Sequence, residues 1–286
     1  MLKEVVRLTN RRIRLLVGLL VAGLFCVQCT RTDADPQSHL ATIIHGVKVG
    51  ENSEVVSETV DRLARTDHIA LLNYCLKNYQ GRYRDYTCTF VKQERVHGVL
   101  GNEQTTNVKF LDQPYSVVMT WTQNAPIGDK VLYVEGKYNN QMLVRPKGIL
   151  RNLVGTVMRK PDSPEAMNST LRPVSMFGFE RSIESLLDVY RQAKEHGDLK
   201  EAFGGYGKVE GRDVVIMARY LPPKGDYPAH VTRVYLDVEY LVPVIVEGVD
   251  WDGKAVCRYL YKDLKFNVGL TPDDFRPEAV DMALPK

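Results

Sequence analysis

The sequence contains few of the residues and motifs that enzymes use for covalent or metal chemistry. Its six histidines are scattered, and none has another histidine at the spacing of a metal-binding pair. It has no G-x-S-x-G or H-E-x-x-H sequence and no glycine-rich phosphate loop between a strand and a helix. These absences argue against the common hydrolases, zinc proteases and nucleotide-binding enzymes, and the sequence predicts no cofactor and no metal site.

Cysteine is also scarce, with five in 286 residues. Cys26 and Cys29 lie in the N-terminal segment, which leaves Cys75, Cys88 and Cys257 in the body of the chain. None of these three has metal-ligand spacing, and an odd number leaves at least one thiol unpaired. Because they stand in apolar helix and strand patterns, we expect them to be packing residues.

The N-terminal segment has no apolar run long enough to span a bilayer. Leu15–Val27 has thirteen residues, whereas a membrane-spanning helix needs about 20. Five basic residues precede it, and this combination is typical of an export signal. We therefore expect residues 1–29 to be an export signal and the mature protein to be soluble in the periplasm or cell envelope. An uncleaved anchor and lipidation of Cys26 or Cys29 are the alternatives.

The formal charge of +3 arises in that same segment, which carries five basic residues and one acidic residue. Subtracting them from the totals of 38 and 35 leaves 33 basic and 34 acidic residues, a net charge of −1. A near-neutral chain offers no electrostatic attraction for a phosphate backbone, so we expect no nucleic-acid partner.

Hydrophobic periodicity divides the remaining chain into helices and strands. Residues 30–53 are polar and aperiodic, which is typical of a flexible linker. Apolar residues at helical spacing predict helices from about Glu54 to Tyr79, the second of them capped near Asp67, and another over Ser182–Lys194. Elsewhere a period of two, interrupted by short turns, predicts about nine to ten antiparallel strands.

The predicted fold class is α+β and mainly β. A sheet of so many strands must curl or split to cover its apolar face, and the helices are the available cover. We therefore expect a single domain over residues 54–286, built as a large curved antiparallel sheet. The helices would pack on the concave side of this sheet.

The clearest strand pattern lies in residues 231–277. It predicts three consecutive strands and a closing segment in which Phe275 is the apolar plug. The predicted strands are Thr232–Leu236, Val244–Val249 and Lys254–Phe266. Asp250 and Asp252 could be an acid–base or metal pair, but together with Gly253 they favour a hairpin turn.

The apolar strand faces are the only functional signal in the sequence. Successive side chains point to opposite faces of a strand, so Val117, Met119 and Trp121 should share the concave side while Thr120 and Thr122 point away. An apolar cavity is predicted to be lined by Phe90, Val108, Phe110, Val117, Met119, Trp121, Leu236 and Val246. The same residues would also serve as an ordinary core beneath the helices, so a hollow and a filled interior are both compatible with the pattern.

Two groups of motifs point to known families. The closing group comprises Tyr235–Asp237, Pro243, Asp250–Gly253, Asn267–Val268 and Leu270–Phe275. It resembles the last strands of the LolA/LolB superfamily of periplasmic lipoprotein carriers. The second group, Tyr86–Arg95, Leu132–Gly136 and Pro161–Pro164, more closely resembles domain-of-unknown-function family 1571 over roughly residues 60–280. The first resemblance implies an unclosed barrel whose helices form a lid over an apolar cavity.

We therefore expect an exported, non-enzymatic protein that binds a lipid or an acylated protein in an apolar cavity and makes transient contact with a membrane. The alternative is a structural or interaction module of the cell envelope with a filled core. An enzyme of unrecognised type comes third, because the strand pattern shows no titratable groups converging in the hollow. The sequence gives neither the identity of a ligand nor the oligomeric state.

Overall fold

A computed structural model describes residues 48–50, 56–126, 128–148 and 155–284. The predicted export signal and most of the predicted linker lie outside these residues. Within that linker, Lys48–Gly50 forms a short strand, β1, which pairs with Lys208, Gly207 and Tyr206 of strand β9. This part of the predicted linker is therefore a regular edge of the sheet.

The helices of the described chain are α2 (Glu58–Thr66), α3 (His68–Arg82), α5 (Pro164–Met167) and α6 (Phe179–Glu195). Side chains of Ser57 and Asp67 cap α2 and α3 by accepting hydrogen bonds from backbone N–H groups that the first helical turn leaves without partners. Helix α3 runs through Gly81 to Arg82, past the predicted end at Tyr79, because Gly81 does not adopt the left-handed conformation that ends a helix. No described helix is both long and apolar enough to cross a membrane.

The strands form one 13-stranded antiparallel sheet from two consecutive meanders, with β1 added at one edge. The first meander contains β2 (Asp85–Val96), β3 (Val99–Leu100), β4 (Gln104–Leu111), β5 (Ser116–Gln123), β6 (Gly128–Val134), β7 (Met142–Pro146) and β8 (Val157–Arg159). The second contains β9 (Lys200–Val209), β10 (Arg212–Tyr220), β11 (Val231–Asp237), β12 (Pro243–Val249) and β13 (Ala255–Phe266). Short strands such as β1, β3 and β8 raise the number above the predicted nine to ten.

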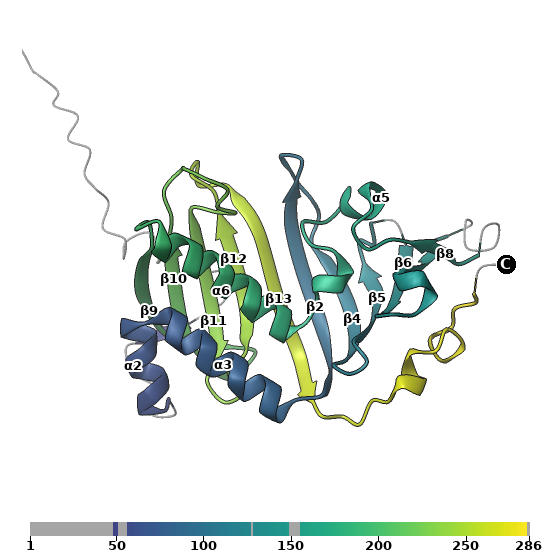
Figure 1. The fold of residues 1–286 in the computed structure, drawn as a ribbon, viewed down its shortest axis with the longest axis horizontal. Coiled ribbons are helices and arrows are strands. Elements are labelled where there is room, and N and C mark those ends of the chain that lie inside the picture. The colour runs from purple at the N-terminus through teal and green to yellow at the C-terminus, as the bar shows by residue number, and fades with distance from the viewer. Residues whose placement is uncertain (1–47, 51–55, 127, 149–154, 285–286) are drawn as a thin grey trace, which may run out of the picture.

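The two meanders meet at the centre of the sheet, where β13 pairs with β2 (Figure 1). Strands β1 and β8 lie at opposite ends of the strand order, so the sheet is unclosed. Helix α6 follows the first meander and leads the chain across to β9 at the far side (Figure 1). The predicted fold class, a mainly β unclosed antiparallel sheet with helical cover, is confirmed.

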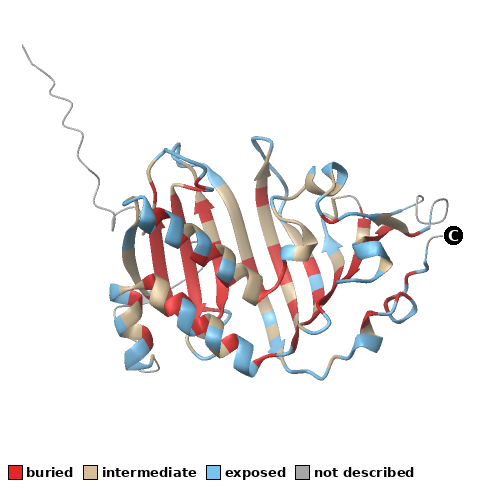
Figure 2. Ribbon diagram, viewed as in Figure 1, coloured by how far each residue is buried: buried red, intermediate tan, exposed pale blue. Residues whose placement is uncertain are grey.

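Helices α2, α3 and α6 cover the half of the sheet that contains β9 to β12, on the left of Figure 1. Buried residues of α3 and α6, such as Leu72 and Leu187, pack against Val215, Val234 and other buried strand residues. Figure 2 shows strands β10 to β12 as largely buried behind the helices. This half of the molecule has a filled core.

The other half of the sheet is covered differently on its two faces. Residues 161–178, named here the cover segment, contain α5 and the short helix Val174–Met176 and lie over the same face as α6 (Figure 1). Residues 267–284, named here the C-terminal segment, follow the last strand and pack on the opposite face. Phe275 of this segment is buried against a cluster that includes Val118 and Leu132. The prediction that Phe275 acts as an apolar plug is confirmed.

Candidate functional site

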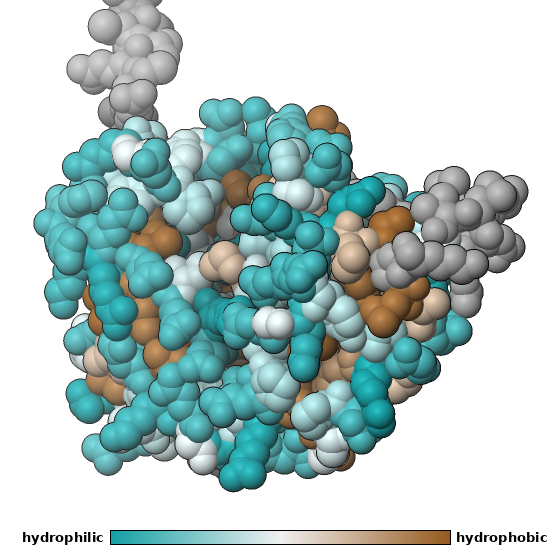
Figure 3. Space-filling view, turned by 45° about the vertical axis from the view of Figure 1, so that its right-hand side comes forward, coloured by the Kyte–Doolittle hydropathy of each residue, from teal (hydrophilic) through white to brown (hydrophobic). Residues whose placement is uncertain are grey.

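A cavity of about 210 Å³ lies between the cover segment and the sheet. Its wall is mostly apolar, and the sheet supplies residues from β2, β4 to β8 and β13. The lining residues Arg159, Glu165 and Met176 are exposed, so the cavity reaches the surface. Figure 3 shows that hydrophilic residues dominate this side of the molecule and that hydrophobic ones reach its surface in small groups.

Three of the eight residues predicted to line a cavity do so: Phe90, Met119 and Trp121. Thr120, between the last two, lies in a separate groove on the other face of the sheet. The predicted alternation of strand β5 is therefore present in the structure. The Trp121 indole N–H donates a 3.0 Å hydrogen bond to Gln104 Oε1, which fixes the ring at the cavity wall.

Val108, Phe110 and Val117 belong to the same buried cluster but do not line the cavity. Phe110 stacks on Tyr86, with 4.8 Å between ring centroids. Gly178, at the start of α6, lies so close to Phe110 that a Cβ atom there would be 2.9 Å from the ring. The packing at this junction is tight, so Val108, Phe110 and Val117 are core residues and leave no space for a ligand beside them.

Leu236 and Val246 lie in the other half of the molecule, in the cluster beneath α2, α3 and α6. The apolar face of the sheet is continuous, but its two halves have different covers. Helices fill one half, whereas the irregular cover segment leaves a space above the other. We therefore restrict the proposed site to the half under the cover segment.

Several lining residues were not predicted from the sequence. Two of them, Tyr259 and Tyr261, lie in strand β13 and face the cavity. Their alternation with charged or aliphatic residues was visible in the sequence. The apolar residues that β6, β7 and β8 contribute are Val131, Met142, Val144 and Val157.

A network of titratable groups also lines the cavity, contrary to the expectation from the strand pattern. Lys92 forms a 2.9 Å ion pair with Glu94, and only 12% and 4% of their side chains are exposed. Tyr259 donates a 2.7 Å hydrogen bond to the other oxygen of Glu94, and burial raises the pKa of the tyrosine well above its usual value. Lys92 also donates to the Thr170 hydroxyl of the cover segment at 2.9 Å.

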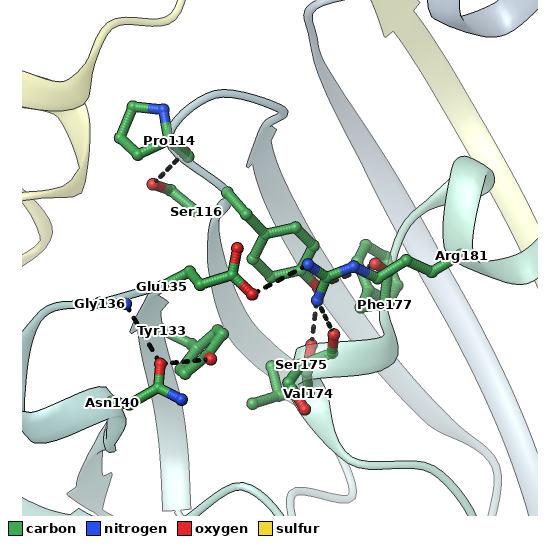
Figure 4. A network of polar contacts seen from close by, with 11 residues as sticks. Pro114, Ser116, Tyr133, Glu135, Gly136, Asn140, Val174, Ser175, Phe177 and Arg181 are labelled. Atoms are coloured by element: carbon green, nitrogen blue, oxygen red, sulfur yellow. Dashed lines mark hydrogen bonds and ion pairs between the residues drawn. The ribbon is translucent and has the colours of Figure 1, made fainter.

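A second network holds the cover segment at the other side of the cavity (Figure 4). The Tyr115 hydroxyl shares its one proton between the carbonyl oxygens of Val174 and Phe177, at 2.9 and 2.8 Å. Arg181 donates to the carbonyl of Ser175 and forms a 3.0 Å ion pair with Glu135. These contacts join the cover segment and α6 to Tyr115 and Glu135, which lie just before β5 and just after β6.

Other candidate residues carry structural roles. The Asp250 side chain accepts hydrogen bonds from the backbone N–H groups of Asp252 and Lys254, which confirms the hairpin turn. The described residues contain no group of histidine, cysteine or acidic side chains that could hold a metal ion. Cys75, Cys88 and Cys257 are free thiols, and the first two are buried.

Comparisons with known proteins give weak structural similarities and one family. No curated protein matches the chain. The solved MucA/MucB complex of Pseudomonas aeruginosa is similar at 15% identity and a TM-score of 0.44, over 74% of this chain and 61% of that one. The chain thus spans less than two thirds of that protein's length.

Two further structures match with small sequence identity. Mycobacterium tuberculosis lipoprotein LppX is 11% identical with a TM-score of 0.40, over 72% of this chain and 99% of LppX. A LolA superfamily protein of Nitrosomonas europaea is 8% identical with a TM-score of 0.31, over 73% and 98% of the two chains. The sequence profile of the family described as "Protein of unknown function (DUF1571)" matches residues 83–283, more than half of the chain, and the protein belongs to this family.

Proposed function

We propose that this protein is a non-enzymatic binding protein that holds an acyl chain of a lipid, or of an acylated protein, in the cavity under the cover segment. The cavity is the observation that carries the proposal. Side chains of Phe90, Met119, Trp121, Val144 and Phe177 present an apolar wall to it. Each methylene group that moves from water onto such a wall contributes about 0.8 kcal/mol.

The size of the cavity favours one slender chain over a whole lipid with several chains. Its volume of about 210 Å³ is below the roughly 300–1,000 Å³ typical of pockets for drug-sized ligands. Met119, Met142 and Met176 line it, and methionine side chains adapt readily to irregular apolar ligands. Rearrangement of these side chains would lengthen the cavity when a chain enters.

The titratable network does not by itself favour an enzyme. Both oxygens of Glu94 are engaged, one with Lys92 and one with Tyr259, so the carboxylate has its hydrogen bonds within the protein. A general base must instead lie within hydrogen-bond distance of the substrate proton that it removes. The alternative function, a structural or interaction module with a filled core, agrees with the half of the sheet beneath α2, α3 and α6. The cavity in the other half argues against it.

Export is part of the proposal. A signal in residues 1–29 would deliver residues 54–286 to the envelope as one soluble binding unit. There, an apolar chain would need shielding from water between its source and its destination. Transient contact with a membrane would then load or unload the cavity.

The test combines native mass spectrometry with tryptophan fluorescence. Mild purification should yield a lipid-bound mass in addition to the free protein. In a Trp251→Phe variant, which leaves Trp121 as the single tryptophan, addition of a long-chain fatty acid should shift the emission to the blue as the ring loses water. Recovery of the free mass alone, with unchanged emission, would contradict the proposal.

A further inference from the structure

The cavity wall carries one positive charge in excess. Lys92, Arg159 and Arg172 are its basic lining residues, and Glu94 and Glu165 are its acidic ones, which gives a net charge of +1. Lys92 is neutralised by Glu94 within the buried ion pair. Arg159 and Glu165 are both exposed, where water screens their charges.

Arg172 is the remaining charge, and it is half-buried. Among the described residues it has no carboxylate partner, whereas Arg145, Arg181, Arg212 and Arg258 all form ion pairs. Its guanidinium carbon lies 6.0 Å from the centroid of the Tyr259 ring, close to the limit of a cation–π contact. A guanidinium beside an apolar cavity, without an anion, is a ready partner for a negatively charged ligand group.

The backbone of Arg172 is held in place from the sheet. Lys92 donates to the Thr170 hydroxyl at 2.9 Å, and that hydroxyl donates to the carbonyl of Arg172 at 3.1 Å. Pro173 follows and restricts Arg172 to an extended conformation. The Lys92–Glu94 pair therefore anchors the loop that carries Arg172, and little ordering of this backbone is needed when a ligand binds.

We propose that the cavity selects single-chain amphiphiles with an anionic head group, which Arg172 binds while the alkyl chain lies against Phe90, Met119 and Trp121. This inference rests on the proposed function and adds the chemical class of the ligand. A carboxylate and a phosphate monoester share the required chemistry, because each offers two oxygens to the planar fork of a guanidinium.

Displacement of a neutral naphthylamine dye from the full chain tests this inference. The competitors are hexadecanoate, hexadecyl phosphate, hexadecanol and hexadecylamine, which differ in the head group. Both anions should compete more strongly than the alcohol, and the amine least. A stronger effect of one anion would identify carboxylate or phosphate as the preferred head group.

Substitutions of Arg172 test the contribution of its charge separately from that of the apolar wall. Arg172→Gln should weaken binding of the anions by about 10- to 100-fold, the equivalent of one charge-assisted hydrogen-bonding contact, and leave hexadecanol unchanged. Arg172→Lys should retain part of the anion preference, and Arg62→Gln, at an exposed position on α2 that does not line the cavity, should retain all of it. Circular dichroism spectra that match the unmodified protein would exclude misfolding of these variants.

Two results would overturn the inference, and they differ in meaning. Equal competition by acid, alcohol and amine, with no selective effect of Arg172→Gln, would refute the head-group site and leave the apolar binding function standing. If neither the dye nor any of the four amphiphiles binds, the proposed function fails and the head-group site fails with it.

Discussion

The guanidinium of Arg181 lies over the ring of Tyr115, with 3.7 Å between Cζ and the ring centroid. Helix α6 contributes the arginine, and the residue just before strand β5 contributes the tyrosine. The hydroxyl of the same tyrosine shares its proton between two carbonyls of the cover segment, so one side chain links the sheet, helix α6 and the cover segment. Burial raises the pKa of the Tyr115 hydroxyl above its usual value.

Replacing Tyr115 by phenylalanine should loosen the cover segment. The ring would remain, but the carbonyls of Val174 and Phe177 would lose their donor, at a cost of about 1–3 kcal/mol in the free energy of unfolding. Urea unfolding should show this loss, and amide hydrogen exchange should be faster in residues 174–178. The matched control is Tyr74→Phe, whose ring is 42% exposed on α3 and whose loss of a hydroxyl should be silent. Equal effects of the two changes would mean that Tyr115 does not hold the cover.

Local patterns in the sequence predicted the strands and the sides on which their residues lie. The alternation of Met119, Thr120 and Trp121 was sufficient for strand β5, and turn chemistry was sufficient for Asp250 and Asp252. Phe275 was predicted as the apolar plug of the closing segment, and it is buried. The strand and turn features depend on neighbours close in the sequence, whereas the apolar partners of Phe275, such as Val118 and Leu132, are distant in the sequence.

The sequence did not predict which distant residues meet in the fold. Glu94 and Tyr259 are 165 residues apart, and they meet because β2 and β13 pair at the centre of the sheet. The sequence showed an apolar face on both meanders. It did not show that helices cover one half of the sheet and the irregular cover segment the other. Leu236 and Val246 were therefore placed with Met119 in one predicted cavity, although helices cover them.

Aspartate at position 119 should disrupt the cavity wall, whereas aspartate at position 120 should not. Met119 is 8% exposed and faces the cavity, and burying a carboxylate there should lower the free energy of unfolding by at least about 2 kcal/mol. Thr120 is only partly buried on the other face, so Thr120→Asp should change stability by no more than about 0.5 kcal/mol. Urea unfolding and binding of the neutral dye would check both variants, and the opposite ranking would refute the register of β5.

Acid should destabilise the protein through His68. This histidine is 1% exposed and lies 3.1 Å from the Tyr190 hydroxyl and 2.9 Å from the carbonyl oxygen of Ala64. Burial lowers its pKa from 6.5 to about 4, so the folded protein keeps it neutral where the unfolded chain already binds a proton. The free energy of unfolding should therefore fall as the pH drops from 6.5 to 4, by up to about 3 kcal/mol from this group, and its contribution should level off below that range.

Urea unfolding at several pH values would measure this dependence. His68→Gln should reduce the slope between pH 6.5 and 5, where most carboxylates remain ionised. His97→Asn, at an exposed turn, should leave the slope unchanged. A slope that persists in His68→Gln would assign the pH dependence to other groups.

Truncating the side chain of Phe275, the C-terminal plug, should lower the stability of the protein without changing its affinity for a ligand. Phe275 is 2% exposed and packs against Val118, Leu132 and Leu143, on the face of the sheet opposite the cavity. Phe275→Ala should lower the free energy of unfolding by about 3–5 kcal/mol through lost burial and a new cavity. Leu284→Ala, at a side chain that is 51% exposed, is the matched control and should cost no more than about 0.5 kcal/mol.

Because the plug does not touch the proposed site, the dye affinity of the folded Phe275→Ala protein should equal that of the unmodified chain. A large loss of affinity in the folded variant would show that the two faces of the sheet are coupled and that the cavity depends on the C-terminal segment.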